Sequence, residues 1–79
     1  MPWVYRVTWP NGSYKDVERA ADAHAAISAR YHISTSMSRI YDEVQRLAID
    51  PLERDKRMRV SGRGDEGDVW IGIELIEVD

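Results

Sequence analysis

Apolar and polar residues alternate near the start of the chain. Large apolar side chains occupy the odd positions from Trp3 to Trp9, and Arg6 and Thr8 lie between them. A period of two predicts a half-buried strand over residues 3–9. The segment Pro10-Asn11-Gly12 then predicts a tight turn. Residues 13–15 are expected to return beside the first strand as a short hairpin arm.

The pattern changes to steps of three and four from about residue 16. Val17, Ala21, Ile27 and Tyr31 recur at helical spacing among good helix formers. The spacing predicts a helix of about four turns over residues 16–31, capped by Asp16 or Ser13. The many alanines around the apolar stripe allow this helix to pack closely on a sheet.

A second helix is predicted from a clear apolar stripe between Met37 and Ala48. Its start is signalled by Ser34, Thr35 or Ser36, any of which can act as the N-cap. Its end is signalled by Pro51, because the residue before a proline avoids helical geometry. Residues 32–36 are therefore expected to connect the two helices.

The rest of the chain predicts a hairpin. Residues 56–61 read as a short strand, residues 62–67 as a glycine-rich connection, and residues 68–78 as a long strand. Both faces of the long strand are largely apolar, which is typical of a strand in the middle of a sheet. We therefore expect the long strand to have neighbours on both sides.

These elements predict an α+β fold in the order β-(β)-α-α-β-β. The mostly antiparallel sheet has three strands, or four if the hairpin arm forms, and both helices pack on one face. The 79 residues contain no cysteine and fit one compact domain, residues 1–79. The absence of cysteine, of a signal-peptide pattern and of an apolar run of about 20 residues predicts a cytoplasmic protein without membrane contact.

A candidate binding surface follows from the expected hairpin register. Folding residues 56–78 about the glycine-rich segment places Val60 opposite Val69 and Met58 opposite Ile71. On the other face Arg59 then lies opposite Trp70 and Arg57 opposite Gly72. With Arg6 and Arg63, these residues form an Arg/Trp surface of the kind enriched in interfaces (Arg6, Arg57, Arg59, Arg63 and Trp70). The alternative is that Arg59 stacks on Trp70 and Arg57 pairs with Glu74 only to cover the open face.

An acidic cluster offers a second candidate surface. Asp65, Glu66, Asp68 and Glu74 follow the basic stretch, within a chain of net charge −3. As an alternative to the Arg/Trp surface, which is slightly favoured, these carboxylates would dock on a basic, nucleic-acid-binding groove of the partner by mimicking phosphate charge.

No cofactor or metal is expected, because His24 and His32 lack metal-pair spacing and no nucleophile has an aligned base. The chain is therefore predicted not to be an enzyme.

Residues 27–40 resemble the helix-turn-helix of bacterial repressors. The match covers less than a fifth of the chain; His32 replaces the expected glycine, one residue is missing between Ser34 and Ser36, and the first helix is too long. The resemblance implies that Ser36, Ser38 and Arg39 contact bases and that the later hairpin is a wing. Against it, Asp42 and Glu43 would be repelled by phosphate.

In size, strand-helix-sheet layout and split charge, the chain resembles phage-borne anti-CRISPR inhibitors. The resemblance implies a non-enzymatic protein that blocks a host protein or nucleoprotein complex, preventing target DNA binding by a CRISPR effector in the bacterial cytoplasm. Direct nucleic-acid binding, as a winged helix-turn-helix regulator, is the alternative function. A homodimeric structural module is a third alternative, because the last strand is apolar on both faces.

Overall fold

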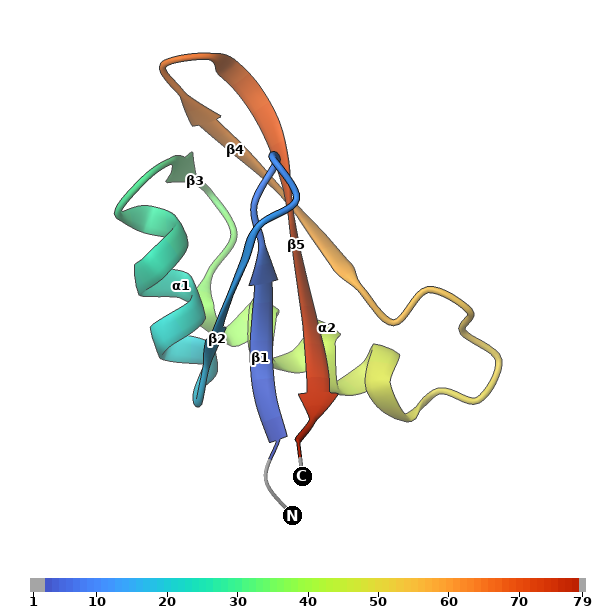
Figure 1. Ribbon diagram of the computed structural model, residues 1–79. Helices are drawn as coiled ribbons and strands as arrows, with labels where there is room; N and C mark the ends of the chain where they lie inside the picture. Colours follow the sequence, from blue (N-terminus) through green and yellow to red (C-terminus); the bar gives the residue numbers. More distant parts are fainter. Residues whose placement is uncertain (1–2, 79) are drawn as a thin grey trace.

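The computed structural model describes residues 3–78, which form a five-stranded antiparallel sheet and two helices (Figure 1). The α+β prediction is therefore confirmed, but the sheet has five strands where three or four were expected. Along the chain the elements are β1 (Trp3–Thr8), β2 (Tyr14–Val17), α1 (Ala20–Ser28), β3 (His32–Ile33), α2 (Met37–Ile49), β4 (Met58–Gly64) and β5 (Gly67–Glu77). Neither helix has the length and apolar character that a membrane-spanning helix requires, as far as residues 3–78 are concerned.

Strand β5 lies at the centre of the sheet, as its two apolar faces predicted. The strand order is β2-β1-β5-β4-β3, and every neighbouring pair is antiparallel. Tyr5 and Val7 of β1 pair with Leu75 and Ile73 of β5, and these side chains point toward the helices. The odd-numbered residues of β1 therefore build the core, as the alternation indicated.

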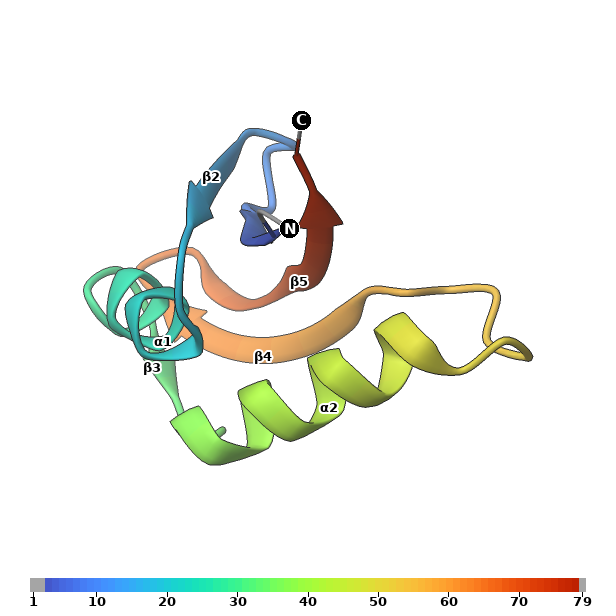
Figure 2. The same ribbon diagram turned by 90° about the horizontal axis from the view of Figure 1, so that it is seen from below.

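Both helices pack on one face of the sheet and close the core. Ile27 of α1 and Ile40 of α2 are fully buried against Val7, Ile71 and Ile73 in one hydrophobic cluster. Figure 2 shows the curvature of the sheet and the two helices beside it. The opposite face carries no helix, and we call it the open face.

Helix α2 begins and ends where its sequence signals place it. The Oγ atom of Ser36 accepts a hydrogen bond from the Arg39 backbone N–H at 3.1 Å, so Ser36 is the N-cap. The helix ends at Ile49, with Asp50 as C-cap and Pro51 after it. An N-cap hydrogen bond satisfies one of the backbone N–H groups that the first turn leaves without a partner.

Helix α1 is shorter than predicted, and both predicted caps are wrong. Tyr14–Val17 pair with β1 as strand β2, so Asp16 lies in a strand and not at a helix start. The N-cap is Arg19, whose side chain makes no capping hydrogen bond. Val17 belongs to β2 but packs on the same core as Ile27, which explains why it continued the apolar stripe of the helix.

The connection between the helices contains strand β3, which was not predicted. His32 and Ile33 pair with Arg63 and Gly62 of β4 at the edge of the sheet. This pairing separates α1 from α2 and replaces the short turn of a helix-turn-helix. The implied base-contacting residue Ser36 uses its hydroxyl as the cap of α2. Residues 27–40 therefore do not form two helices joined by a short turn, as the helix-turn-helix resemblance implied.

The β4–β5 hairpin differs from the predicted one by two residues in register. Val60 lies opposite Ile71, Arg59 opposite Gly72, and Ser61 opposite Trp70. The cause is that Gly62 and Gly64 belong to β4, which spans Met58–Gly64 and not residues 56–61, and the turn contains only Asp65 and Glu66. Of the three glycines in this segment only Gly67 has a positive φ, 98°, which matches a turn position.

Candidate functional site

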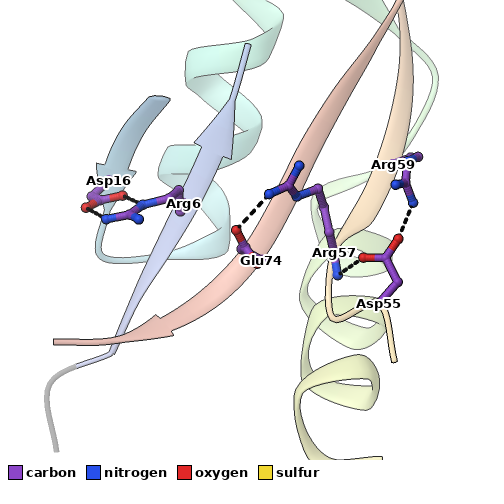
Figure 3. Close-up of polar contacts among 6 residues, drawn as sticks. All are labelled: Arg6, Asp16, Asp55, Arg57, Arg59 and Glu74. Carbon is purple, nitrogen blue, oxygen red and sulfur yellow. Dashed lines mark hydrogen bonds and ion pairs between the residues drawn. The ribbon is translucent and has the colours of Figure 1, made fainter. Parts of the chain in front are cut away.

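All five residues predicted for the binding surface lie on the open face. Arg6 projects from β1, Arg59 and Arg63 from β4, and Trp70 from the central strand β5, while Arg57 directly precedes β4. Figure 3 shows three of these arginines with the carboxylates that hold them, in front of the strands and with α2 behind. The strand periodicity thus placed these residues correctly despite the register error.

Arg57 occupies a slot that a glycine creates in the central strand. Gly72 has no side chain, and the aliphatic stem of Arg57 lies across it so closely that a Cβ atom there would overlap the Arg57 Cδ atom. The Nη2 atom of Arg57 donates to Oε1 of Glu74 at 3.2 Å (Figure 3). The predicted Arg57–Glu74 pair is therefore confirmed, and it fixes this guanidinium over the middle of the sheet.

Asp55 orients Arg59 at the entrance to β4. Its Oδ1 atom accepts the Arg57 backbone N–H at 3.0 Å, and its Oδ2 atom accepts from Nη1 of Arg59 (Figure 3). The Arg59 hydrogen bond, helped by the backbone one, holds the pKa of Asp55 below its usual value, because both favour the charged carboxylate. Arg59 is thus paired with Asp55, and no stacking of Arg59 on Trp70 is found among the cation–π contacts of residues 3–78.

Arg6 and Arg63 are held in the same way, away from the centre. Arg6 donates to both carboxylate oxygens of Asp16 at 2.8 and 3.0 Å and lies 4.0 Å from the ring centre of Tyr14. This pairing lowers the pKa of Asp16 from its ordinary value. Arg63 donates to Asp68 at 3.1 Å near the tip of the hairpin, where both side chains are exposed. An exposed pair of this kind adds little stability.

Arg57, Arg59 and Trp70 line a shared shallow hollow of about 270 Å³. The end of β1 at Thr8 and the following turn at Pro10 form its other wall. Trp70 is 64% exposed and is the most accessible aromatic side chain of residues 3–78. Arg6 and Arg63 do not line this hollow, so the structure reduces the five predicted residues to a centre of three with two at the margins.

Sequence reasoning missed the hairpin turn and Asp55 as parts of this surface. The Gly12 N–H donates to the Trp9 carbonyl at 2.9 Å, and Gly12 has φ 91°, so the predicted turn forms tightly against the hollow. Asp55 precedes Arg57 by two residues, the spacing of an Asx turn that the chain also uses at Asn11. That spacing was the available signal for Asp55.

The acidic residues do not gather into one surface. Asp65 and Glu66 form the hairpin turn, where Glu66 accepts a hydrogen bond from the Tyr31 hydroxyl at 3.1 Å. Asp68 and Glu74 lie six residues apart on β5, about 20 Å along a strand, and each holds an arginine. The predicted acidic surface is therefore dispersed, and two of its four carboxylates belong to the Arg/Trp face.

Residues with catalytic or metal-binding potential are scattered. His24 is half-buried on α1, and His32 is exposed in β3 opposite Arg63. Nowhere in residues 3–78 do three His, Cys, Asp or Glu side chains gather closely enough to hold a metal ion. Comparison with known proteins returned no family model, no curated protein and no solved structure that matches this chain. The geometry of the open face is thus the basis for a functional proposal.

Proposed function

We propose that this chain is a non-enzymatic binding protein that uses the open face of its sheet to cover a functional surface of a partner macromolecule. The proposal rests on one observation: Arg57, Arg59 and Trp70 surround a hollow on a face that neither α1 nor α2 covers. Tryptophan and arginine are the residues that most often dominate binding energy when an interface buries them.

The ion pairs on the open face favour binding by limiting its entropic cost. Arg57, Arg59 and Arg6 are each fixed by a carboxylate before any partner arrives. Ordering long side chains on association costs free energy, so side chains that are already ordered lose less. The remaining guanidinium N–H groups can donate to acceptors on the partner.

A protein surface suits this face better than bare nucleic acid. Its four arginines are matched by four carboxylates, Asp16, Asp55, Asp68 and Glu74. Nucleic-acid binding depends on an excess of positive charge that neutralises phosphates. A charge-balanced face with an exposed tryptophan lacks this excess.

We extend the proposal to the phage-borne anti-CRISPR inhibitors, which the chain resembles in size and layout. The partner is then a protein surface of a bacterial CRISPR effector complex.

Charge reversal on the open face tests the first part of the proposal. The variant Arg57→Glu/Arg59→Glu should lose capture of the partner from bacterial lysate while its circular dichroism spectrum stays that of the wild type. The matched control is Arg39→Glu/Arg46→Glu, which reverses two exposed arginines on α2, on the other side of the sheet. Capture retained by the first variant, or lost equally by both, would refute the role of this face.

The inhibitor class needs a separate measurement. Purified CRISPR effector complexes should bind labelled target DNA less tightly when this protein is added, and the Arg57→Glu/Arg59→Glu variant should not have this effect. The alternative, a DNA-binding regulator, is tested by a gel shift in which this protein alone is mixed with duplex DNA at low salt. A shift by the protein alone would contradict the proposal of a protein partner, and unchanged DNA binding by the effectors would remove the inhibitor class.

A further inference from the structure

A second surface lies on the helix side of the sheet, beside α2. Two neighbouring hollows of about 470 and 390 Å³ both have Tyr5 and Glu18 in their lining, and we refer to the pair as the groove. The groove follows α2 from Met37 to Ile49. Twelve residue steps of an α-helix correspond to a length of about 18 Å. The groove is therefore long enough for about three turns of a partner helix.

Exposed apolar side chains line both ends of this groove. Met37 and Tyr41 are 47% and 52% exposed at one end, and Trp3 and Ile49 are 45% and 79% exposed at the other. These are four of the seven large apolar side chains that residues 3–78 leave exposed. A concentration of this kind on one side of a small domain indicates an interaction site.

The charges of the groove identify the kind of partner. Glu18 and Asp42 line it, and neither forms an ion pair with any residue between 3 and 78. The one cation in the lining, Arg19, is already paired with Asp22 at 3.3 Å. The open face, in contrast, matches each of its arginines with a carboxylate. The groove thus offers apolar surface with two carboxylates that hold no cation at ion-pair distance among residues 3–78.

We propose that this groove binds a basic amphipathic helix of a partner protein, with its apolar side on Met37 and Tyr41 and its Lys or Arg residues beside Glu18 and Asp42. A helix satisfies its own backbone, which matters here because the strands that line the groove, β1 and β5, are interior strands without a free edge. A second copy of this chain fits less well, because a two-fold contact centred on the groove brings like carboxylates together.

The test uses two synthetic 14-residue peptides with leucines on one helical side and either lysines or glutamates on the other. Amide NMR spectra of the protein should shift around residues 37–49 with the Leu/Lys peptide and not with the Leu/Glu peptide. The variant Glu18→Lys/Asp42→Lys should bind the Leu/Lys peptide about tenfold more weakly, because two exposed attractions become repulsions. It should gain affinity for the Leu/Glu peptide.

The controls separate this groove from the open face. Arg57→Glu/Arg59→Glu should bind the Leu/Lys peptide like the wild type, so loss of partner capture by that variant leaves the groove proposal unaffected. Binding of neither peptide, equal binding of both, or shifts confined to the open face would overturn the proposal. A dimer in sedimentation that Tyr41→Glu dissociates would assign the groove to a second copy and overturn it as well.

Discussion

Gly62 and Gly72 lie on opposite faces of adjacent strands, and adding one methyl group to each separates packing from binding. Gly62 faces the helices and contacts Ile71 and Tyr31, whereas Gly72 faces the open side under Arg57. Both have backbone conformations that alanine adopts without strain, since neither has a positive φ. The substitutions Gly62→Ala and Gly72→Ala therefore differ mainly in what the new methyl group meets.

At Gly62 the methyl group meets side chains that belong to the core or pack against it. A Cβ atom would lie 2.8 Å from Cδ1 of Ile71 and 3.0 Å from Cβ of Tyr31. Carbon atoms in optimal contact are roughly 3.5–4.0 Å apart. Overpacking of this kind costs about 1–3 kcal/mol, and the smaller entropy of the unfolded alanine chain returns about 0.4–1 kcal/mol. We expect a net loss of about 1–2 kcal/mol, a fall in Tm of roughly 5–15 °C.

At Gly72 the methyl group meets a side chain that can leave. The overlap is with Cδ and Cγ of Arg57, whose side chain is 40% exposed and can rotate into solvent. The loss of its partly exposed ion pair with Glu74 costs about 0–1 kcal/mol, which the alanine entropy term offsets. We expect the unfolding free energy to change by less than about 0.5 kcal/mol, while Arg57 leaves its position over the central strand.

Urea denaturation followed by circular dichroism measures both changes, and NMR of the arginine Nη–H groups reports whether Arg57 still donates to Glu74. The substitution Ile71→Val removes the Cδ1 atom that lies nearest to the new methyl group at Gly62. In the Ile71→Val background, Gly62→Ala should therefore lower the unfolding free energy by less than it does in the wild type. Equal destabilisation by both glycine variants, or an unchanged midpoint for Gly62→Ala, would refute the packing described for β4.

Three further predictions concern the cap of α2, the carboxyl groups of Asp16 and Asp55, and the hydroxyl of Tyr31. Ser36→Ala should lower the unfolding free energy by about 1 kcal/mol in urea titrations, with Ser38→Ala as a control that changes it by less than about 0.5 kcal/mol. The pKa values of Asp16 and Asp55 are lowered in the folded protein, so both groups stabilise the fold above the pKa that they have in the unfolded chain. This stability is lost as the pH falls through the pKa of the folded state. In urea titrations between pH 2 and 7, the Asp16→Asn variant should therefore lose less stability on acidification than the wild type. Desolvation, followed by the hydrogen bond to the Glu66 carboxylate, raises the pKa of Tyr31. The contribution of Tyr31 to folding stability is therefore complete below its pKa in the unfolded chain and is lost as the pH rises through its pKa in the folded protein. The Tyr31→Phe variant should accordingly lose less thermal stability at alkaline pH than the wild type.

Elements with strong local signals were predictable from the sequence. Helix α2 has an apolar stripe, a serine cap and a following proline, and its predicted limits are confirmed within a residue or two. Strand β5 was placed at the centre because both of its faces are apolar. Arg57, Arg59 and Trp70 were placed on the open face because alternation along a strand survives a register error of two residues.

Elements defined by distant contacts were not predictable. Strand β3 has two residues and exists only through pairing with β4. The hairpin register was wrong because Gly62 and Gly64 read as a loop, although they are strand residues that make room for the ring of Tyr31. The start of α1 carries no side-chain cap, so Arg19 gave no signal. Asp55 is a different case, because its contacts with Arg57 and Arg59 are local and its two-residue spacing from Arg57 was a signal that the prediction did not use.

The central position of β5 also determines when this protein can fold during synthesis. β5 follows all other elements described, yet it is the strand that joins β1 to β4. As the nascent chain leaves the ribosome, the first hairpin and both helices emerge without the strand that completes their shared core. Their apolar sides are exposed to chaperones and proteases until β5 arrives. A premature stop within β5 would therefore leave two unjoined halves for degradation.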